Sequence, residues 1–201
     1  MILYAAIAAG TLLTGTYFEA RTCSVFAGPC HVSGEIVTDG RIAVVAVNFE
    51  IGELAGKSAA AVICSDQNLA FHSPRRSVLY VDASASPSQR EQLKTLLTQR
   101  SRIDFGSIVA TEPALVRLDV PGRNATLRIE DSSGKLLYAA QTSGRECLAC
   151  SMPGELWYQP LGDGVRANVA TVEEQALYDT RLGETFVRKD EAAAFVGRFA
   201  W

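Results

Sequence analysis

The sequence predicts an α+β protein that is mostly antiparallel β-sheet, built as a sandwich or barrel, with one main helix at about residues 86–101. Two observations favour this class. Short runs rich in β-branched and aromatic residues recur along the 201-residue chain, with Gly, Pro or Asp turn signals between them. A single stretch combines a helix start signal with leucines at helical spacing. Short strands with turns this frequent are typical of antiparallel sandwiches and barrels.

The strands are expected in two groups, one before the helix and one after it. In the first group Asp39-Gly40 is a two-residue hairpin signal, and the strands form an antiparallel meander. These strands are expected at 14–23, 31–38, 41–51, 57–65 and 77–83. In the second group Pro113 and Pro121-Gly122 separate successive strands. These strands are expected at 108–111, 114–120, 125–130, 135–142, 165–178, 184–188 and 193–201.

The helix has the clearest start signal in the chain. Ser86 is the expected N-cap, Pro87 suits the first helical position, and Gln89 completes a capping box. Apolar positions spaced three and four apart then predict one buried stripe, formed by Leu93, Leu96 and Leu97.

The composition is that of an ordinary soluble globular protein. Hydrophobic residues make up 48% of the chain and charged residues 20%, and we expect a single domain over residues 14–201. The net charge is −3 and the basic residues are scattered. Because a phosphate-binding face needs clustered Lys and Arg, nucleic acid is not an expected partner. The sequence predicts no particular oligomeric state.

Residues 1–13 form an apolar start to the chain. The first eighteen residues carry no charged side chain. This pattern favours an export signal or membrane anchor, and hence a periplasmic or membrane-anchored protein outside the cytoplasm. No Lys or Arg precedes the apolar run, which leaves open the alternative of a cytoplasmic protein whose first strand follows directly.

Four of the five cysteines fall into two clusters far apart in the sequence. Cys23 and Cys30 flank a Gly-Pro turn, with His31 following, and Cys147 and Cys150 precede Met152. We expect the fold to bring the two clusters together. The fifth cysteine, Cys64, lies in an apolar run and is expected to be a buried small hydrophobe. An odd number of cysteines cannot pair completely within one chain.

The clusters suit more than one chemistry. Four thiolates, or three with a histidine, suit zinc, whereas thiolate and thioether ligands suit Cu(I), so Met152 favours copper. The alternative is a disulfide-stapled structural or interaction module without metal. A third possibility is a thiol–disulfide redox protein using Cys147 and Cys150. Pro153-Gly154 disfavours it, because such a motif works at a helix N-terminus.

Three groups of short motifs spread over nearly the whole chain: Gly15-Thr-Tyr-Phe-Glu-Ala-Arg-Thr-Cys23 with Gly28-Pro-Cys30, Leu79-Tyr-Val-Asp82 with Ala85-Ser-Pro-Ser-Gln-Arg90, and Ala194-Phe-Val-Gly-Arg-Phe199. In these stretches the chain resembles the bacterial domain of unknown function 1326 family, which has no assigned activity. The resemblance implies a metal-binding role and a membrane-protein partner. Carried onto this chain, it implicates Cys23, Cys30, Cys147 and Cys150.

The usual catalytic constellations are missing from the sequence. His31 and His72 are the only histidines, and no serine lies in a Gly-x-Ser-x-Gly elbow. We expect His72 to be a solvated loop residue. An enzyme is therefore not predicted, and soft-metal binding, with copper or zinc, is the favoured function.

Overall fold

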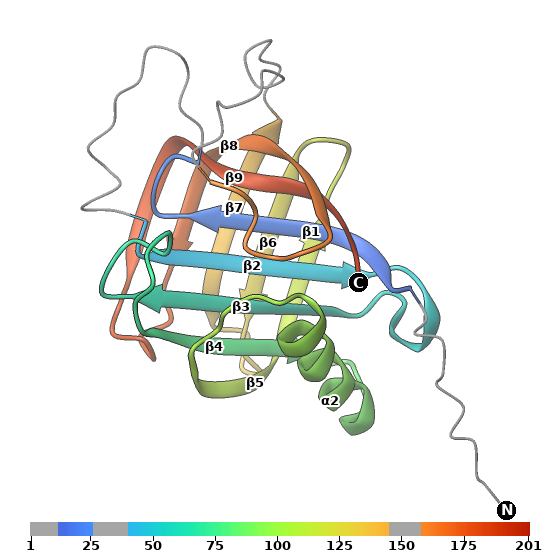
Figure 1. Ribbon diagram of the computed structural model, residues 1–201. Helices are drawn as coiled ribbons and strands as arrows, with labels where there is room; N and C mark the ends of the chain where they lie inside the picture. The colour runs from blue at the N-terminus through green and yellow to red at the C-terminus, as the bar shows by residue number, and fades with distance from the viewer. Residues whose placement is uncertain (1–11, 26–39, 145–157) are drawn as a thin grey trace, which may run out of the picture.

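The computed structural model describes residues 12–25, 40–144 and 158–201. In these residues nine strands form one closed barrel, in which each strand pairs with its neighbours in sequence and β1 pairs with β9 (Figure 1). All pairings are antiparallel except that of β4 with β5. The predicted class, mostly antiparallel sheet with one main helix, is confirmed.

The strands and helices have the following bounds. The strands are β1 Thr14–Arg21, β2 Ile42–Phe49, β3 Ser58–Ser65, β4 Arg75–Asp82, β5 Ser107–Asp119, β6 Ala125–Glu130, β7 Leu136–Gly144, β8 Val165–Leu177 and β9 Phe186–Ala200. The main helix comprises α2, Pro87–Thr95, and a π-helical turn η2, Leu96–Arg100, and a short 3₁₀ turn η1 covers Gly52–Leu54.

Strand alternation divides the core into two layers. Side chains from all nine strands, such as Phe18 and Tyr138, fill the barrel interior. The opposite face of β1 to β4 carries a second apolar cluster on the outside of the barrel, which includes Tyr17 and Phe49. Most positions on both faces of these four strands are therefore buried, which explains the nearly continuous apolar sequences of β2 and β3.

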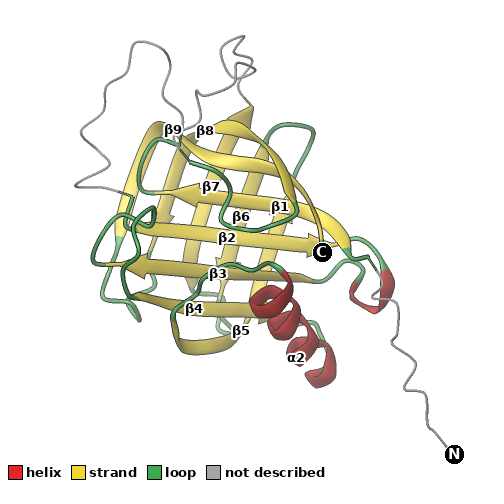
Figure 2. Cartoon of the chain, viewed as in Figure 1, coloured by secondary structure: helices red, strands yellow, loops and turns green. Residues whose placement is uncertain are grey.

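The helix covers this outer cluster. Figure 2 shows α2 lying over β3 and β4. The capping box is confirmed, with Ser86 accepting from Gln89 N–H and the Gln89 side chain accepting from Ser86 N–H. Leu93 and Leu97 are fully buried in the outer cluster and Leu96 packs on its edge, so the predicted stripe is also confirmed.

Two expected breaks in strands were wrong. Residues 107–119 form one strand, although Pro113 was expected to divide it. At Pro113 the strand pairs only with β4, since pairing with β6 begins at Leu115, and an unpaired strand edge tolerates a residue without an N–H. The stretches 184–188 and 193–201 likewise belong to one strand, β9. A register shift and the left-handed Asp190 (φ 56°) absorb the polar residues between them.

The expected antiparallel meander is present over β1 to β4, but the hairpin expected at Asp39-Gly40 is wrong, because β1 and β3 occupy both edges of β2. β1 pairs directly with β2, and β2 to β4 follow in antiparallel order. The strand expected at 31–38 lies outside the described residues, as do the apolar residues 1–11. Along the part of the chain that the structure describes, no helix has both the length and the apolar character to cross a membrane.

Candidate functional site

The structure describes Cys23 and Cys64 among the cysteines, and it places them on opposite sides of the barrel wall. Cys64 lies in the interior cluster, as expected for a buried small hydrophobe, and burial raises the pKa of its thiol. Cys23 follows β1 and lies in a separate buried cluster. The other predicted site residues lie outside the described residues: Cys30, His31, Cys147, Cys150 and Met152.

Cys23 continues a line of polar side chains along the outer face of β1. Tyr17, Glu19 and Arg21 alternate with the interior residues of this strand, and Cys23 is next in the same alternation. Glu19 and Arg21 are charged yet only 0% and 3% exposed, and their side chains form an ion pair of 2.6 Å. Burial of both charges requires further hydrogen bonds in place of water.

The chain that follows residue 157 supplies those hydrogen bonds. Arg21 donates to the carbonyl of Gln159 (2.7 Å), and Glu19 accepts from the backbone N–H of Leu161 (2.8 Å). Tyr17 also donates its hydroxyl to Glu19 (2.5 Å). The polar line on β1 is thus an internal network between the barrel wall and the segment that crosses it.

The network shifts the pKa values of Tyr17 and Arg21. Burial, followed by the Glu19 charge, raises the pKa of Tyr17 well above its usual value, so this hydroxyl stays a donor. Burial alone would lower the pKa of Arg21. The charge of Glu19 and its hydrogen bond outweigh burial, with smaller contributions from Cys23 and Tyr17, and the pKa is raised. A permanently charged guanidinium therefore stands near Cys23.

Cys23 itself is enclosed by residues from three other parts of the chain. Its thiol and the Tyr158 hydroxyl form a hydrogen bond, and Asn68 donates to the same hydroxyl (3.0 Å). The Arg21 guanidinium lies 4.9 Å from the centre of the Tyr158 ring. Gly40 closes the remaining side: a Cβ there would lie 2.8 Å from the Cys23 sulfur, and φ is +75°. Both features require glycine at this position.

Three of the described residues that flank residues 26–39 and 145–157 lie close to Cys23. Val25 and Tyr158 lie with Cys23 in one buried cluster, and Gly40 contacts it from the other side. Gly144, at the other end of the second segment, pairs with Ala170 on β8, and β9 stands between β8 and β1. Both ends of residues 26–39 and one end of residues 145–157 therefore lie close to the Cys23 thiol.

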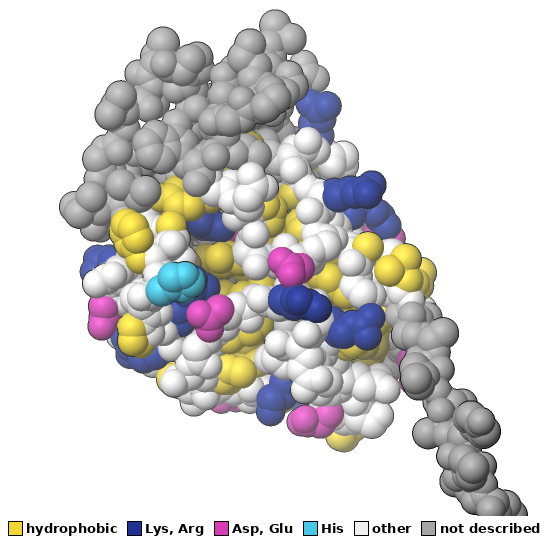
Figure 3. Space-filling model, in the orientation of Figure 1, with side chains coloured by type: hydrophobic (Ala, Val, Ile, Leu, Met, Phe, Trp, Pro, Cys, Tyr) yellow, Lys and Arg dark blue, Asp and Glu magenta, His cyan; other side chains and the backbone are white. Residues whose placement is uncertain are grey.

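The described residues do not by themselves form a metal centre. Within residues 12–25, 40–144 and 158–201, no three or more His, Cys, Asp or Glu side chains are grouped so as to hold an ion. His72 is exposed, as expected. On the face shown in Figure 3, acidic and basic side chains are interspersed with neutral and apolar ones.

Sequence reasoning missed the network around Cys23. The signal available was the placement of Glu19 and Arg21 on one face of an apolar strand, in phase with Tyr17 and Cys23. No local pattern links this face to Asn68 or Tyr158, which reach it from distant parts of the chain.

Comparison with known proteins identifies no family. No protein-family model and no curated protein matches the chain. Among solved structures it is similar to acetoacetate decarboxylase from Legionella pneumophila subsp. pneumophila str. Philadelphia 1, with a TM-score of 0.46 and 7% identity over 96% of this chain and 84% of that one. A second structure, from structural studies of acetoacetate decarboxylase, has a TM-score of 0.47 and 7% identity over 94% and 86% of the two chains. At these values the likeness says nothing of a reaction or ligand.

Proposed function

We propose that the protein binds a soft metal ion, copper in preference to zinc, at a site that includes Cys23. Cys30, Cys147 and Cys150 are the further cysteine ligands, with His31 or Met152 as accessory ligands. The observation that carries the proposal is the packing of Val25, Gly40 and Tyr158 around Cys23, because these residues flank the two cysteine-bearing segments.

Chain length permits the shared site. Cys30 comes five residues after Val25, and Cys150 comes eight residues before Tyr158. At about 3.3–3.6 Å per residue these tethers reach at most roughly 18 Å and 29 Å. Because Val25 and Tyr158 both pack beside Cys23, each tether is long enough to bring its cysteine to the Cys23 sulfur.

The surroundings of Cys23 support a thiolate ligand. The Arg21 guanidinium, which is paired with Glu19, lies near Cys23, and a neighbouring cation is one feature of metal-binding cysteines. The Tyr158 hydroxyl donates toward the sulfur, which is how outer-shell groups orient a metal ligand. Asn68 in turn orients Tyr158, so the sulfur belongs to a connected polar arrangement.

Metal content and thiol number, measured on protein purified without reductant or chelator, test the proposal. The expected result is stoichiometric copper or zinc together with titratable thiols after denaturation. Four blocked thiols without metal would instead support the disulfide-stapled module. Cys147–Cys150 exchange with a model disulfide, in metal-free protein, would support the redox alternative.

Two matched variants locate the site. Cys23→Ala is expected to lose most of the bound metal, whereas Cys64→Ala, on the interior side of the same wall, is expected to retain it. Full metal content in folded Cys23→Ala would show that Cys23 is not a ligand, and the shared site would then be abandoned.

The proposed cellular location and partner rest on the amino-acid sequence. A location outside the cytoplasm rests on the apolar residues 1–13, and a membrane-protein partner rests on the resemblance to the domain of unknown function 1326 family. Fractionation of cells producing the full chain tests the location, and cross-linking to membrane proteins in the same cells tests the partner.

A further inference from the structure

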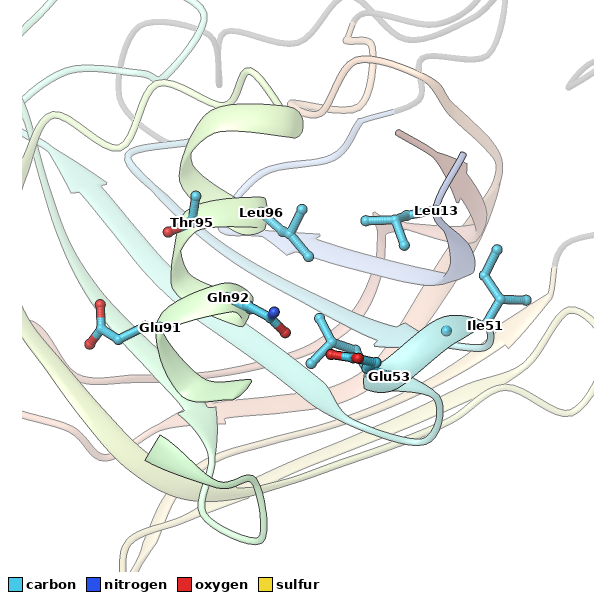
Figure 4. A pocket seen from close by; sticks show the side chains of 9 residues that line it. Leu13, Ile51, Glu53, Glu91, Gln92, Thr95 and Leu96 are labelled. Atoms are coloured by element: carbon cyan, nitrogen blue, oxygen red, sulfur yellow. The ribbon is translucent and has the colours of Figure 1, made fainter. Parts of the chain in front are cut away.

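A groove of about 560 Å³ lies on the outside of the barrel, between the main helix and the turn after β2. One wall is formed by α2 and the first residue of η2, and the other by Ile51 and the η1 turn. Figure 4 shows the side chains of Leu13, Ile51 and Leu96 around this space. The size falls within the range of ligand-binding pockets, roughly 300–1,000 Å³.

The groove is built on the outer apolar cluster and is tied together at one end. Leu54 belongs to that cluster, and Leu13 and Leu96 pack against it. The Gln89 side chain donates to the carbonyl of Glu53 (2.8 Å) and so links the helix to the turn. Ile51 remains 39% exposed in this opening. The groove therefore exposes apolar side chains to water in a concave surface whose walls are held together.

The chain itself enters at this groove. Leu13 exchanges two backbone hydrogen bonds of 2.8 Å with Trp201, which fixes its position beside the opening. Leu12, one residue earlier, is 60% exposed. Residues 1–11 thus join the barrel at the groove. Their apolar side chains are Met1, Ile2, Leu3, Tyr4, Ile7 and the alanines at positions 5, 6, 8 and 9.

We propose that this groove is the docking site of the chain's own residues 1–11 in protein that keeps these residues and does not insert them in a membrane. Ile7 is five residues from Leu12, so the chain can place it at most roughly 18 Å away, and Leu3 within about 32 Å. Glu53 and Glu91 at the groove disfavour an acidic partner, and residues 1–11 carry no acidic side chain. Covalent attachment gives this occupant a high effective concentration over any partner in solution.

Hydrogen exchange of the full chain tests the proposal with a matched pair of variants. Ile51 lines the groove and Ile108 lies on β5, and both side chains are 39% exposed. Amides of residues 2–9 are expected to exchange at least about tenfold more slowly than in an unstructured peptide. Ile51→Ser should remove this protection and Ile108→Ser should keep it. Ile7→Asp, which leaves the barrel sequence unchanged, should also remove it.

Three results would overturn the proposal. The first is exchange of residues 2–9 at unstructured rates in the unmodified chain. The second is protection that Ile51→Ser leaves intact. The third is protection of the Ile51–Leu54 amides by another occupant. A dimer mass with concentration-dependent protection would identify a second copy of the chain. A co-purifying lipid in native mass spectra would identify a foreign ligand. Metal content does not enter any of these readouts, so failure here is distinct from failure of the metal site.

Discussion

Glu19 and Arg21 form a buried ion pair that also holds the segment over β1. Glu19 accepts from Tyr17, Arg21 and the backbone of Leu161, while Arg21 also donates to Gln159. A buried ion pair often adds little stability compared with apolar residues in its place, but removal of one partner leaves the other charge buried without compensation.

We expect Glu19→Ala to destabilise the protein by about 3–5 kcal/mol, because Arg21 would remain buried and unpaired. Urea unfolding followed by circular dichroism measures this loss. The double variant Glu19→Ala/Arg21→Met should recover part of it, since no buried charge is then left.

The matched control for this prediction is an exposed pair. Glu50→Ala breaks the surface ion pair with Arg198 and should change the unfolding free energy far less than Glu19→Ala does. Equal losses in the two variants would mean that burial of the Glu19–Arg21 pair has no special consequence.

A second residue-scale prediction concerns acid stability. Asp179 accepts hydrogen bonds from the Tyr80 hydroxyl and from the backbone and guanidinium of Arg181. Burial alone would raise the pKa of Asp179, but these hydrogen bonds and the Arg181 charge outweigh it and hold the pKa below the ordinary 3.8. A lowered native pKa stabilises the fold above the unfolded pKa, and this contribution is lost as the pH falls through the native value.

The stability difference between the unmodified chain and Asp179→Asn should therefore be constant from pH 7 to about 5 and shrink below about pH 4. Urea unfolding at several pH values between 7 and 2.5 checks it. A difference that stays constant down to pH 2.5 would contradict the lowered pKa of Asp179.

At the scale of elements, the sequence predicts those helices and strands whose ends are determined by residues adjacent in the chain. The capping box of Ser86 and the leucine stripe define α2, and turn signals define β6 with the bounds found, Ala125–Glu130. The errors at Pro113 and near Asp190 have a different cause. Whether a proline or a polar run ends a strand depends on which partner strand lies beside it. The residues next to it in the sequence do not identify that partner strand.

The same reasoning applies to the proposed metal site. Cys23 could be selected from the sequence because soft ligands are rare and chemically distinctive. Its enclosure by Asn68 and Tyr158 could not, since these contacts join residues far apart in the chain. The packing of Val25, Gly40 and Tyr158 around Cys23 also joins residues far apart in the chain, so no local stretch reveals it.

For the whole molecule, the decisive contact is the seam where the first and last strands meet. β1 pairs with both β2 and β9, and the backbone hydrogen bonds between Leu13 and Trp201 extend the seam beyond the strands. On the outer face of the seam Phe199 packs edge-to-face on Phe49 at 5.2 Å and lies 4.2 Å from the Trp201 ring. A Cβ on Gly15 would lie 1.9 Å from the Asn48 carbonyl oxygen and 2.7 Å from the Phe199 ring, so the close approach of both requires glycine here.

Because barrel closure joins all nine strands, we expect Phe199→Ala to weaken the entire fold by about 3–5 kcal/mol. Phe71→Ala removes an equal side chain that is 44% exposed in a loop and should change stability by less than about 0.5 kcal/mol. Tryptophan fluorescence and far-ultraviolet circular dichroism in urea should give one shared midpoint for each protein, shifted downward only in Phe199→Ala. If the two probes separate in Phe199→Ala, the seam opens independently of the remaining barrel, and closure is not what makes the fold cooperative.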